Sequence, residues 1–234
     1  KILSFTPCGN KIYFGLGSLL QKNIKGRNGP MNSAINLVKK IKILVKEDAV
    51  IMDVGTGWYH HEPFLLYLIG NYKIYLFDIK DKAQINYIKN YLLGIRDNMD
   101  MVCQELQIDK TISIEKINYL LSLKSKDDIY NTCNFHPVIT KQTDKMFLPE
   151  NSIDIMMSNC VFNHVPTNIL IPELKILRKF LKNDGLMHFL IGHDDHWTFH
   201  DPSMNMFQYY RYSDRYYKWI FETKFQFQNR LVKK

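Results

Sequence analysis

The chain has 234 residues, of which 46% are hydrophobic and 23% charged, and its formal net charge is +8. This composition excludes an intrinsically disordered chain, and the length is sufficient for one good-sized hydrophobic core. The longest apolar run, over 63–70, is far too short to cross a membrane and no secretory signal is visible, so we expect a cytoplasmic protein.

The positive charge is spread along the chain and is not gathered in one block. Lysines are frequent in a helix-like stretch that contains Lys39, Lys40, Lys42 and Lys46. Such spacing predicts a solvated helix face, with attraction for an anionic substrate as the alternative. The four cysteines form no Cys-x-x-Cys pair, which argues against a zinc site or a disulfide framework.

Helical and strand patterns alternate along the first half of the chain. Apolar residues recur at helical spacing from Ser33, a candidate N-cap, to about Lys46. The β-branched run over 49–54 predicts a buried strand that leads into a glycine turn. A short helix over 63–69, a strand over 73–78 and a helix over 85–95 follow, listed here in chain order. This alternation predicts parallel strands joined by right-handed crossovers.

The strand rhythm is interrupted over 96–135, where apolar spacing predicts a helix between polar stretches. Strands are predicted again over 136–140 and 153–158. A helix with Leu170, Leu174, Leu177 and Leu181 on one face follows, and we expect Asp184-Gly185 to close it. A final buried strand is predicted over 186–191.

Two strand ends carry the strongest functional signal. Asp53-Val54-Gly55-Thr56-Gly57 closes the first strand, and Asp78 closes the second. Glycines at such a turn let the backbone approach a ligand closely, and an acid on the next strand can accept from the hydroxyls of a ribose. Proteins that bind nicotinamide, flavin and S-adenosylmethionine cofactors share this arrangement.

Three further features narrow the class. Asp53 lies two residues before the first glycine and suits a ligand with an ammonium group and no pyrophosphate. The stretch 143–154 contains an acid, Leu-Pro and Asn-Ser-Ile-Asp in that order, and 177–185 is a Leu-x-x-x-Leu-Lys-x-x-Gly run. Residues 49–192 therefore resemble class I S-adenosylmethionine-dependent methyltransferases, in which these runs lead into the fourth and fifth strands.

The resemblance implies a fold and a cofactor. The fold is α/β, with a doubly wound, mostly parallel, Rossmann-like sheet and a helical insertion. The cofactor is S-adenosyl-L-methionine, with S-adenosyl-L-homocysteine as the product. The pattern departs from the family at Tyr59, where a third glycine is missing, and this leaves the course of the loop open.

The resemblance also implies which residues bind each part of the cofactor. The glycine turn would hold the methionyl part, Asp53 its ammonium group and Asp78 the ribose. Asp144 would accept from the adenine amino group, and Asn159 would line the sulfonium end. The full set implied is Asp53, Gly55, Thr56, Gly57, Asp78, Ile79, Asp144, Lys145 (or Met146) and Asn159.

Ligands of parallel sheets gather at the carboxyl ends of the strands, so we expect the methyl acceptor after the fourth and fifth strands. His164 follows the fourth strand, and His193, Asp195, His196 and Asp201 follow the fifth. His196 or His164 is the candidate general base, oriented by Asp195 or Asp201. A purely structural role for each histidine remains the alternative.

The C-terminal part resembles a bacterial subgroup of small methyltransferases associated with surface-polysaccharide or capsule biosynthesis. The similar motifs are Asp195-His196-Trp197, Tyr210-Arg211-Tyr212-Ser213-Asp214 and Asn229-Arg230-Leu231. They imply an acceptor pocket that tolerates anions, because guanidinium groups suit phosphate or carboxylate and aromatic faces suit sugars. The substrate-binding set implied is His193, Asp201, Tyr210, Arg211, Tyr212 and Arg230.

We therefore expect one methyltransferase domain whose acceptor is a small, polar, anionic molecule. Candidate acceptors are a sugar, a nucleotide-linked sugar, a phosphate or a phosphoramidate precursor, with O-methylation favoured. No nucleic-acid or membrane partner and no metal is expected. The predicted parts are an N-terminal cap segment and helix (1–47), a cofactor-binding core (48–95 and 136–192), the helical insertion (96–135) and an acceptor-binding segment (193–234).

Three other functions compete with this interpretation. His193, His196 and His200 with nearby aspartates could hold zinc or iron, as in a hydrolase or oxygenase. The charge suits a nucleic-acid methyltransferase, but 158–161 lacks the (Asp/Asn)-Pro-Pro-aromatic tetrad and no proline precedes Cys160. A binding module that keeps the cofactor as a structural ligand is the third.

Overall fold

A computed structural model describes residues 28–192, 203 and 205–220. The chain divides into two compact units. The larger unit contains the described residues 28–159 and 174–190, and the smaller contains the described residues 160–173, 191–192, 203 and 205–220. Each unit is described by itself.

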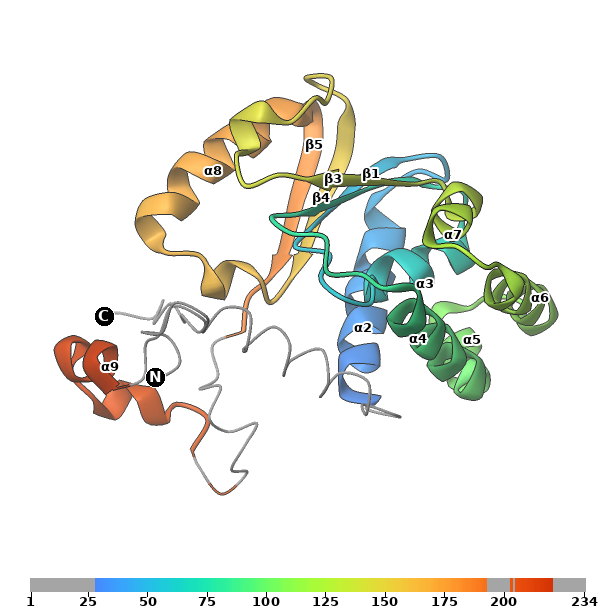
Figure 1. Ribbon diagram of the computed structural model, residues 1–234, viewed down its shortest axis with the longest axis horizontal. Coiled ribbons are helices and arrows are strands. Elements are labelled where there is room, and N and C mark those ends of the chain that lie inside the picture. Colours follow the sequence, from blue (N-terminus) through green and yellow to red (C-terminus); the bar gives the residue numbers. More distant parts are fainter. Residues whose placement is uncertain (1–27, 193–202, 204, 221–234) are drawn as a thin grey trace. The chain divides into compact units, whose positions relative to one another are not determined.

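The larger unit is built on a sheet of five strands in the order β3-β2-β1-β4-β5, and all its strand pairs are parallel (Figure 1). The strands are β1 (Val50–Val54), β2 (Lys73–Asp78), β3 (Phe135–Ile139), β4 (Ile153–Asn159) and β5 (Leu181–Leu190). The strand order reverses between β1 and β4. In open α/β sheets, ligands bind outside the carboxyl ends of the strands at such a reversal.

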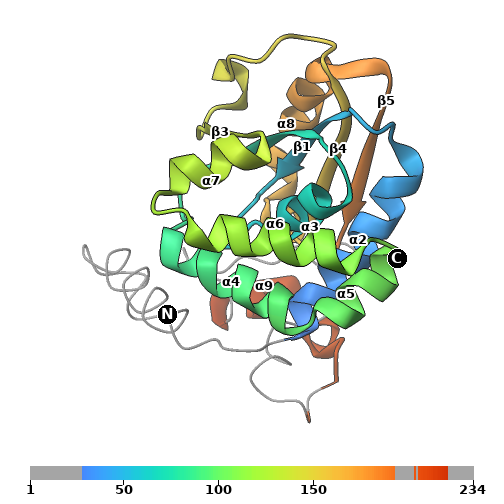
Figure 2. The same cartoon turned by 90° about the vertical axis from the view of Figure 1, so that its right-hand side faces the viewer.

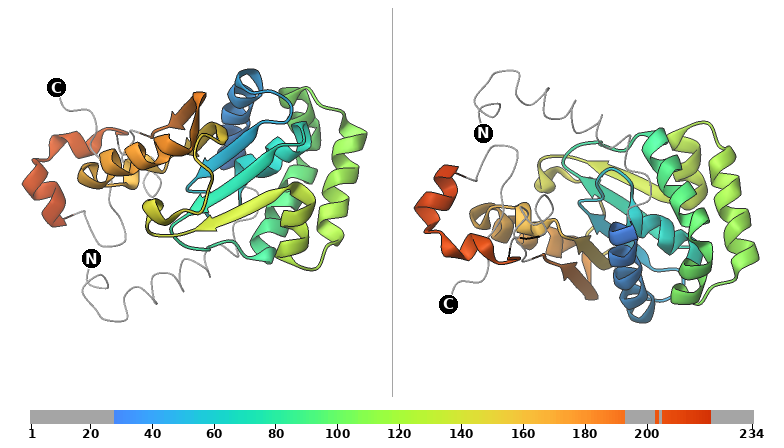
Figure 3. Two further views of the ribbon diagram at one scale, coloured as in Figure 1. Left: turned by 90° about the horizontal axis from the view of Figure 1, so that it is seen from above. Right: turned by 90° about the horizontal axis from the view of Figure 1, so that it is seen from below.

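One face of the sheet carries a continuous layer of helices (Figure 2). They are α2 (Asn28–Leu44), α3 (His61–Ile69), α4 (Ile85–Asp97), α5 (Met99–Leu106), α6 (Lys110–Ser122) and α7 (Lys126–Cys133). The helix α8 (Thr167–Phe180) joins β4 to β5, and its last turns, 174–180, lie on the other face (Figure 3). A right-handed crossover requires this change of face where the strand order reverses.

The main core lies between the sheet and this helical layer. Ile51, Ile74 and Ile155, from three neighbouring strands, are fully buried or nearly so and belong to one hydrophobic cluster. The apolar faces predicted for 33–46 and 85–95 are the faces that pack there; for example, Ile41 and Leu92 are both 0% exposed. The predicted α/β class with a parallel sheet is confirmed, because the described strand pairs are parallel and helices lie on both faces.

The predicted insertion is also confirmed, but it contains three helices, α5, α6 and α7, where the sequence pattern predicted one. Two local caps separate them. The Asp109 side chain accepts a hydrogen bond from the Ile112 N–H, and the Ser125 side chain accepts one from the Asp128 N–H. These helices are short and mostly polar outside their contacts, so their periodicity in the sequence is weak.

The prediction that Ser33 caps a helix is wrong. Helix α2 begins at Asn28 and includes Pro30 in its first turn, where a backbone N–H needs no partner. Ser33 therefore lies within the helix. Its hydroxyl pairs instead with Asn159 at the end of β4.

The prediction that Asp184-Gly185 closes the helix is also wrong. Helix α8 ends at Phe180, and β5 already includes residues 181–190. The register slips between the pairs Ile153–Leu181 and Ile155–Leu186, so the extra residues of β5 form an irregularity within the strand. A Cβ atom on Gly185 would lie 2.9 Å from the Ile153 carbonyl oxygen, so the close approach of the two strands requires glycine.

The thiols of Cys103 and Cys133 are buried, that of Cys160 is exposed, and none of these three cysteines forms a disulfide. None of the helices in the described segments has the length and hydropathy of a membrane span.

Gly185→Ala should destabilise the protein by about 1–3 kcal/mol, because the added methyl group has no room beside β4. Gly94→Ala is the matched control, since its Cβ would meet only the Met31 side chain at 3.7 Å and alanine favours a helix. We expect a gain of about 0.5–1 kcal/mol from this control. Urea unfolding measures both values, and equal effects from the two variants would contradict the close contact at Gly185.

Candidate functional site

The turn after β1 depends on two glycines in the left-handed region of backbone conformation. Gly55 has φ of 81° and Gly57 has φ of 67°. Other residues adopt these values only with strain. The N–H groups of Gly55 and Thr56 both donate to the Phe77 carbonyl oxygen, at 2.7 and 3.2 Å. The turn is therefore held against the end of β2.

Asp78, the last residue of β2, is buried and lies against this turn. Its carboxylate accepts from the Gly57 N–H at 3.1 Å and from the Lys80 N–H at 3.2 Å, and it forms an ion pair with Lys82 at 3.2 Å. A carboxylate can accept about four hydrogen bonds. The Asp78 carboxylate therefore has one acceptor position left, and a second would become available if Lys82 moved away. Two such positions could accept from the two hydroxyls of a ribose.

Two carboxylates are buried side by side where the strand order reverses. Asp53, the last residue but one of β1, is 3% exposed, and Glu62 in the first turn of α3 is 6% exposed. The Asn159 amide donates to Glu62 Oε1 at 2.6 Å. Among the described residues, Asp53 Oδ2 has no hydrogen-bond partner, and neither acid forms an ion pair.

The electrostatics of this pair follow from its burial. Burial, with the nearby charge of Glu62, raises the pKa of Asp53 well above its usual range, and a hydrogen bond with Thr56 only partly offsets this. Burial also raises the pKa of Glu62, against the opposing hydrogen bond from Asn159. A cation placed here would restore both acids to their ionised forms. The arrangement can therefore bind a small ammonium group.

Sequence reasoning missed Glu62 and Ser33 as parts of this site. An acid in the first turn of a helix is common because it interacts favourably with the helix dipole, so Glu62 carries no distinct signal. Ser33 appeared to be a helix cap. Its hydroxyl accepts from the Asn159 amide at 3.2 Å, which brings α2 into the site.

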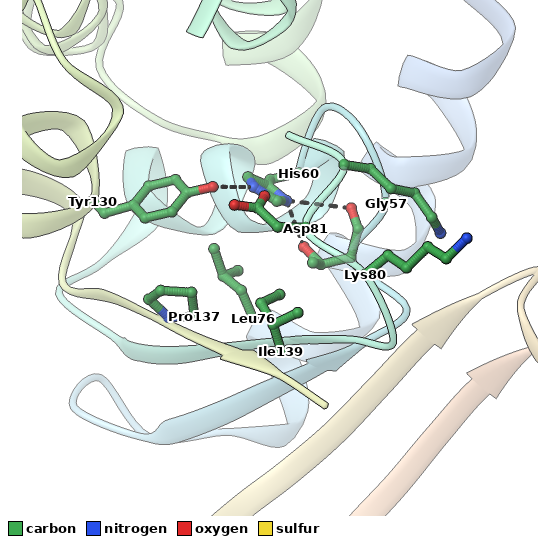
Figure 4. Close-up of a pocket in the computed structure, with 10 residues that line it drawn as sticks. Gly57, His60, Leu76, Lys80, Asp81, Tyr130, Pro137 and Ile139 are labelled. Atoms are coloured by element: carbon green, nitrogen blue, oxygen red, sulfur yellow. Dashed lines mark hydrogen bonds between the residues drawn. The ribbon is translucent and has the colours of Figure 1, made fainter. Parts of the chain in front are cut away.

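A buried histidine connects the glycine turn to the helical insertion. His60 has a left-handed backbone, with φ of 52°. Its Nδ1 lies 2.6 Å from Thr56 Oγ1, and its Nε2 lies 2.6 Å from the Tyr130 hydroxyl on α7 (Figure 4). Burial lowers the pKa of His60 to about 4, so the imidazole is neutral near pH 7. The link supports the turn without adding a positive charge.

The structure defines the loop where the third glycine is missing. Tyr59 packs its ring on His61, with centroids 5.2 Å apart, and on Tyr87, at 5.8 Å. The residue after Tyr59, His60, has a left-handed backbone, as Gly55 and Gly57 do earlier in the loop. Tyr59 therefore contributes packing at a position where the family pattern has glycine.

A small recess lies between the glycine turn and the insertion, lined by Gly57, His60, Leu76, Tyr130 and Ile139 among others (Figure 4). Its volume is about 10 Å³. A cavity of this size holds about one water molecule. It is a junction between packed elements and is too small for an adenine ring.

The remaining cofactor candidates lie at the same edge of the sheet. The Thr140 N–H, after β3, donates to the Asp78 carbonyl oxygen at 3.2 Å. Asp144 and Lys145 follow in a short 3-10 helix, η2 (Thr143–Lys145), and both are exposed. Ile79 is 55% exposed. The glycine turn, Asp53, Asp78 and Asn159 thus lie together at the carboxyl ends of the strands, and η2 follows the neighbouring strand.

The acceptor candidates that the structure describes belong to the smaller unit. His164 is exposed at the end of η3 (Phe162–His164). Arg211 is exposed at the end of η5 (Gln208–Arg211), Tyr210 and Tyr212 are half-buried, and α9 (Asp214–Ile220) follows. The other candidates lie outside the described residues, and these are His193, Asp195, His196, His200, Asp201 and Arg230.

No protein-family model and no curated protein matches the chain. Similar solved structures include a candidate S-adenosyl-L-methionine-dependent methyltransferase from Methanococcus maripaludis, which is 12% identical over 83% of this chain and 71% of its own, with a TM-score of 0.44. Another is phosphoethanolamine N-methyltransferase 1 of Haemonchus contortus in complex with phosphoethanolamine and S-adenosylhomocysteine, 13% identical with a TM-score of 0.45. The match covers 83% of this chain and 34% of that longer protein.

Asp53→Asn should stabilise the protein without ligand, by about 1–3 kcal/mol at pH 8, because a buried carboxylate with no ion pair among the described residues is replaced by a neutral group. The pKa of Asp53 is raised in the folded state, so its carboxyl favours folding at low pH and opposes it as the pH rises through that value. The gain should therefore shrink at pH 4. Urea unfolding at both pH values tests this, with Asp97→Asn on the exposed face of α4 as a control that should show no such difference.

Proposed function

We propose that this chain is an S-adenosyl-L-methionine-dependent methyltransferase. The observation that carries the proposal is the buried pair Asp53 and Glu62, which has no cation among the described residues and lies where the strand order reverses. The ammonium group of a methionyl moiety has the charge and size to fill that place. The geometry of the glycine turn and the buried Asp78 at the end of β2 support binding of the adenosyl part of the same cofactor.

The residues fit this cofactor on several independent grounds. The orphaned Asp53 Oδ2 needs a hydrogen-bond donor, which the ammonium group would provide. Gly57 presents backbone next to Asp78, so a ribose held by Asp78 would lie against the turn. Ile79 is 55% exposed and Asp144 in η2 is exposed, so both side chains are accessible to an adenine, with Asp144 as the acceptor for its amino group.

S-adenosylmethionine supplies a methyl group that its sulfonium already activates. The tasks left to the protein are to bind and orient the two reactants and to exclude water, and orientation of this kind contributes about 7–11 kcal/mol in favourable cases. Asn159, fixed by Glu62 and Ser33, would line the reacting end. The acceptor hydroxyl would release its proton to His196, oriented by Asp195, or to His164.

The acceptor that we propose is a small, polar, anionic molecule of the kind used in surface-glycan biosynthesis, with O-methylation favoured. The net charge of +8 supports attraction for an anion. Arg211 and its neighbours Tyr210 and Tyr212 in the smaller unit, with His193, Asp201 and Arg230, are the binding residues that the resemblance in the sequence implies. Guanidinium groups bind phosphate and carboxylate, and tyrosine rings pack on sugars.

Isothermal titration with S-adenosylhomocysteine tests the cofactor assignment, and we expect one site per chain. Asp53→Asn and Asp78→Ala should each weaken binding at least about tenfold, the equivalent of about 1.4 kcal/mol. Asp97→Asn is the control and should bind like the unmodified protein. An absence of binding, or full binding by the Asp53 variant, would overturn the proposal.

A methyl-transfer assay with sugar phosphates and nucleotide-linked sugars tests the acceptor class and the base. His196→Ala should lower kcat by about 10²–10⁴ if His196 removes the proton, and turnover of this variant should recover as the pH rises. Binding of S-adenosylhomocysteine should not change. Unchanged turnover would remove His196 from the mechanism and leave His164 to be tested in the same way.

A further inference from the structure

A second and much larger hollow lies along α2. Its volume is about 500 Å³, and the described residues that line it are Ser33, Asn36, Lys39, Lys40, Ile43 and Leu190. Sites for small molecules typically measure about 300–1,000 Å³. The hollow is therefore large enough for a substrate, unlike the junction beside His60.

The lining residues of α2 form one stripe on the helix. Ser33, Asn36, Lys40 and Ile43 follow one another at spacings of three or four residues, so they share a face. Ala34, Val38 and Ile41 occupy the opposite face and are 0% exposed in the core. Helix α2 thus has one side fixed by packing and one side open to the hollow, on which Ile43 is 83% exposed.

The inner end of the hollow reaches the proposed cofactor site. Leu190 is the register partner of Asn159 across β4 and β5. Ser33 exchanges hydrogen bonds with the same Asn159, whose amide also donates to Glu62. A molecule in the hollow would therefore have one end beside the residues that we assign to the reacting end of the cofactor.

Charge is distributed unequally along this hollow. Lys39 pairs with Glu105 on α5 at 2.8 Å, and the Lys42 ammonium donates to the Leu106 carbonyl oxygen at 2.8 Å. In the part of the chain that the structure describes, Lys40 forms no ion pair or hydrogen bond. The inner end is acidic and the outer end has a cation without a partner, so an anionic group would be repelled from Glu62 and attracted to Lys40.

We propose that this hollow binds the methyl acceptor, and that the acceptor carries a phosphate or carboxylate at the end remote from the methylated atom. Lys40 and the Asn36 amide hold that anion, while Ile43 and Leu190 contact the middle of the molecule. Ser33 and Lys40 are seven positions apart, about 10 Å along a helix, which sets the approximate length of the acceptor. The inference rests on the proposed methyltransferase function and adds the site and orientation of its substrate, with Lys40 and Asn36 holding the anion in place of Arg211 and its neighbours.

The test uses three probes titrated into the full chain saturated with S-adenosylhomocysteine: glucose 6-phosphate, glucuronate and glucose. We expect at least one of the two anions to bind more tightly than glucose, and the better one identifies the charged group. Lys40→Gln should weaken binding of that anion about tenfold and leave glucose unaffected, whereas Lys40→Arg should retain most of the affinity.

Lys46→Gln is the matched control, because it removes the same charge beyond the end of α2 and away from the hollow. It should change anion binding less than twofold, which separates a local contact from the effect of net charge. S-adenosylhomocysteine affinity should be equal in all three variants. The acceptor site is wrong if S-adenosylhomocysteine binds but neither anion binds more tightly than glucose. It is also wrong if the Lys40→Gln variant binds the anion as tightly as the unmodified protein. In both cases the cofactor assignment stands. If S-adenosylhomocysteine itself fails to bind, the proposed function is wrong.

Discussion

Two buried carboxylates, which have no counter-ion among the residues that the structure describes, are the constraint around which this site is organised. Asp53 and Glu62 come from β1 and α3, and the turn between these elements brings them together. An acid removed from water is costly unless a cation or sufficient hydrogen bonds compensate it, and Asp53 has an oxygen with no partner among the described residues. A pair of this kind reduces the stability of the protein without ligand and increases its affinity for a cation. We regard it as the feature most closely tied to function.

The surrounding structure keeps the pair both close together and uncompensated. The glycine turn is bonded to the end of β2, and His60 connects Thr56 to Tyr130 in the insertion. Because burial keeps His60 neutral, this support introduces no positive charge that would compete for the acids. Lys82, which follows β2, pairs with Asp78. The insertion thus contributes to the site through α7, although it lies outside the core strands.

Helix α2 links the acidic cofactor site to the far end of the proposed acceptor site. Ser33 bonds with Asn159 near its beginning, and Lys40 follows about two turns later on the same face. This polarity orients a substrate whose charged group must avoid the acids. Attraction at one end and repulsion at the other discriminate between orientations more strongly than either would alone.

The sequence by itself determined the parallel α/β sheet and the positions of Asp53, the glycine turn and Asp78, because these depend on local patterns. Burial periodicity identifies strands and helices, and glycines directly after a predicted strand indicate a tight turn with positive φ, as at Gly55 and Gly57. Only the tertiary structure decided that Glu62, Asn159 and Ser33 meet beside Asp53, since they come from three elements distant in the chain. It also decided which lysine of α2 lacks a partner within the described part of the chain. The sequence does not distinguish Lys39, Lys40 and Lys42 from one another. Packing of α5 against α2 pairs Lys39 with Glu105 and Lys42 with the Leu106 carbonyl, whereas Lys40 lies beside the hollow.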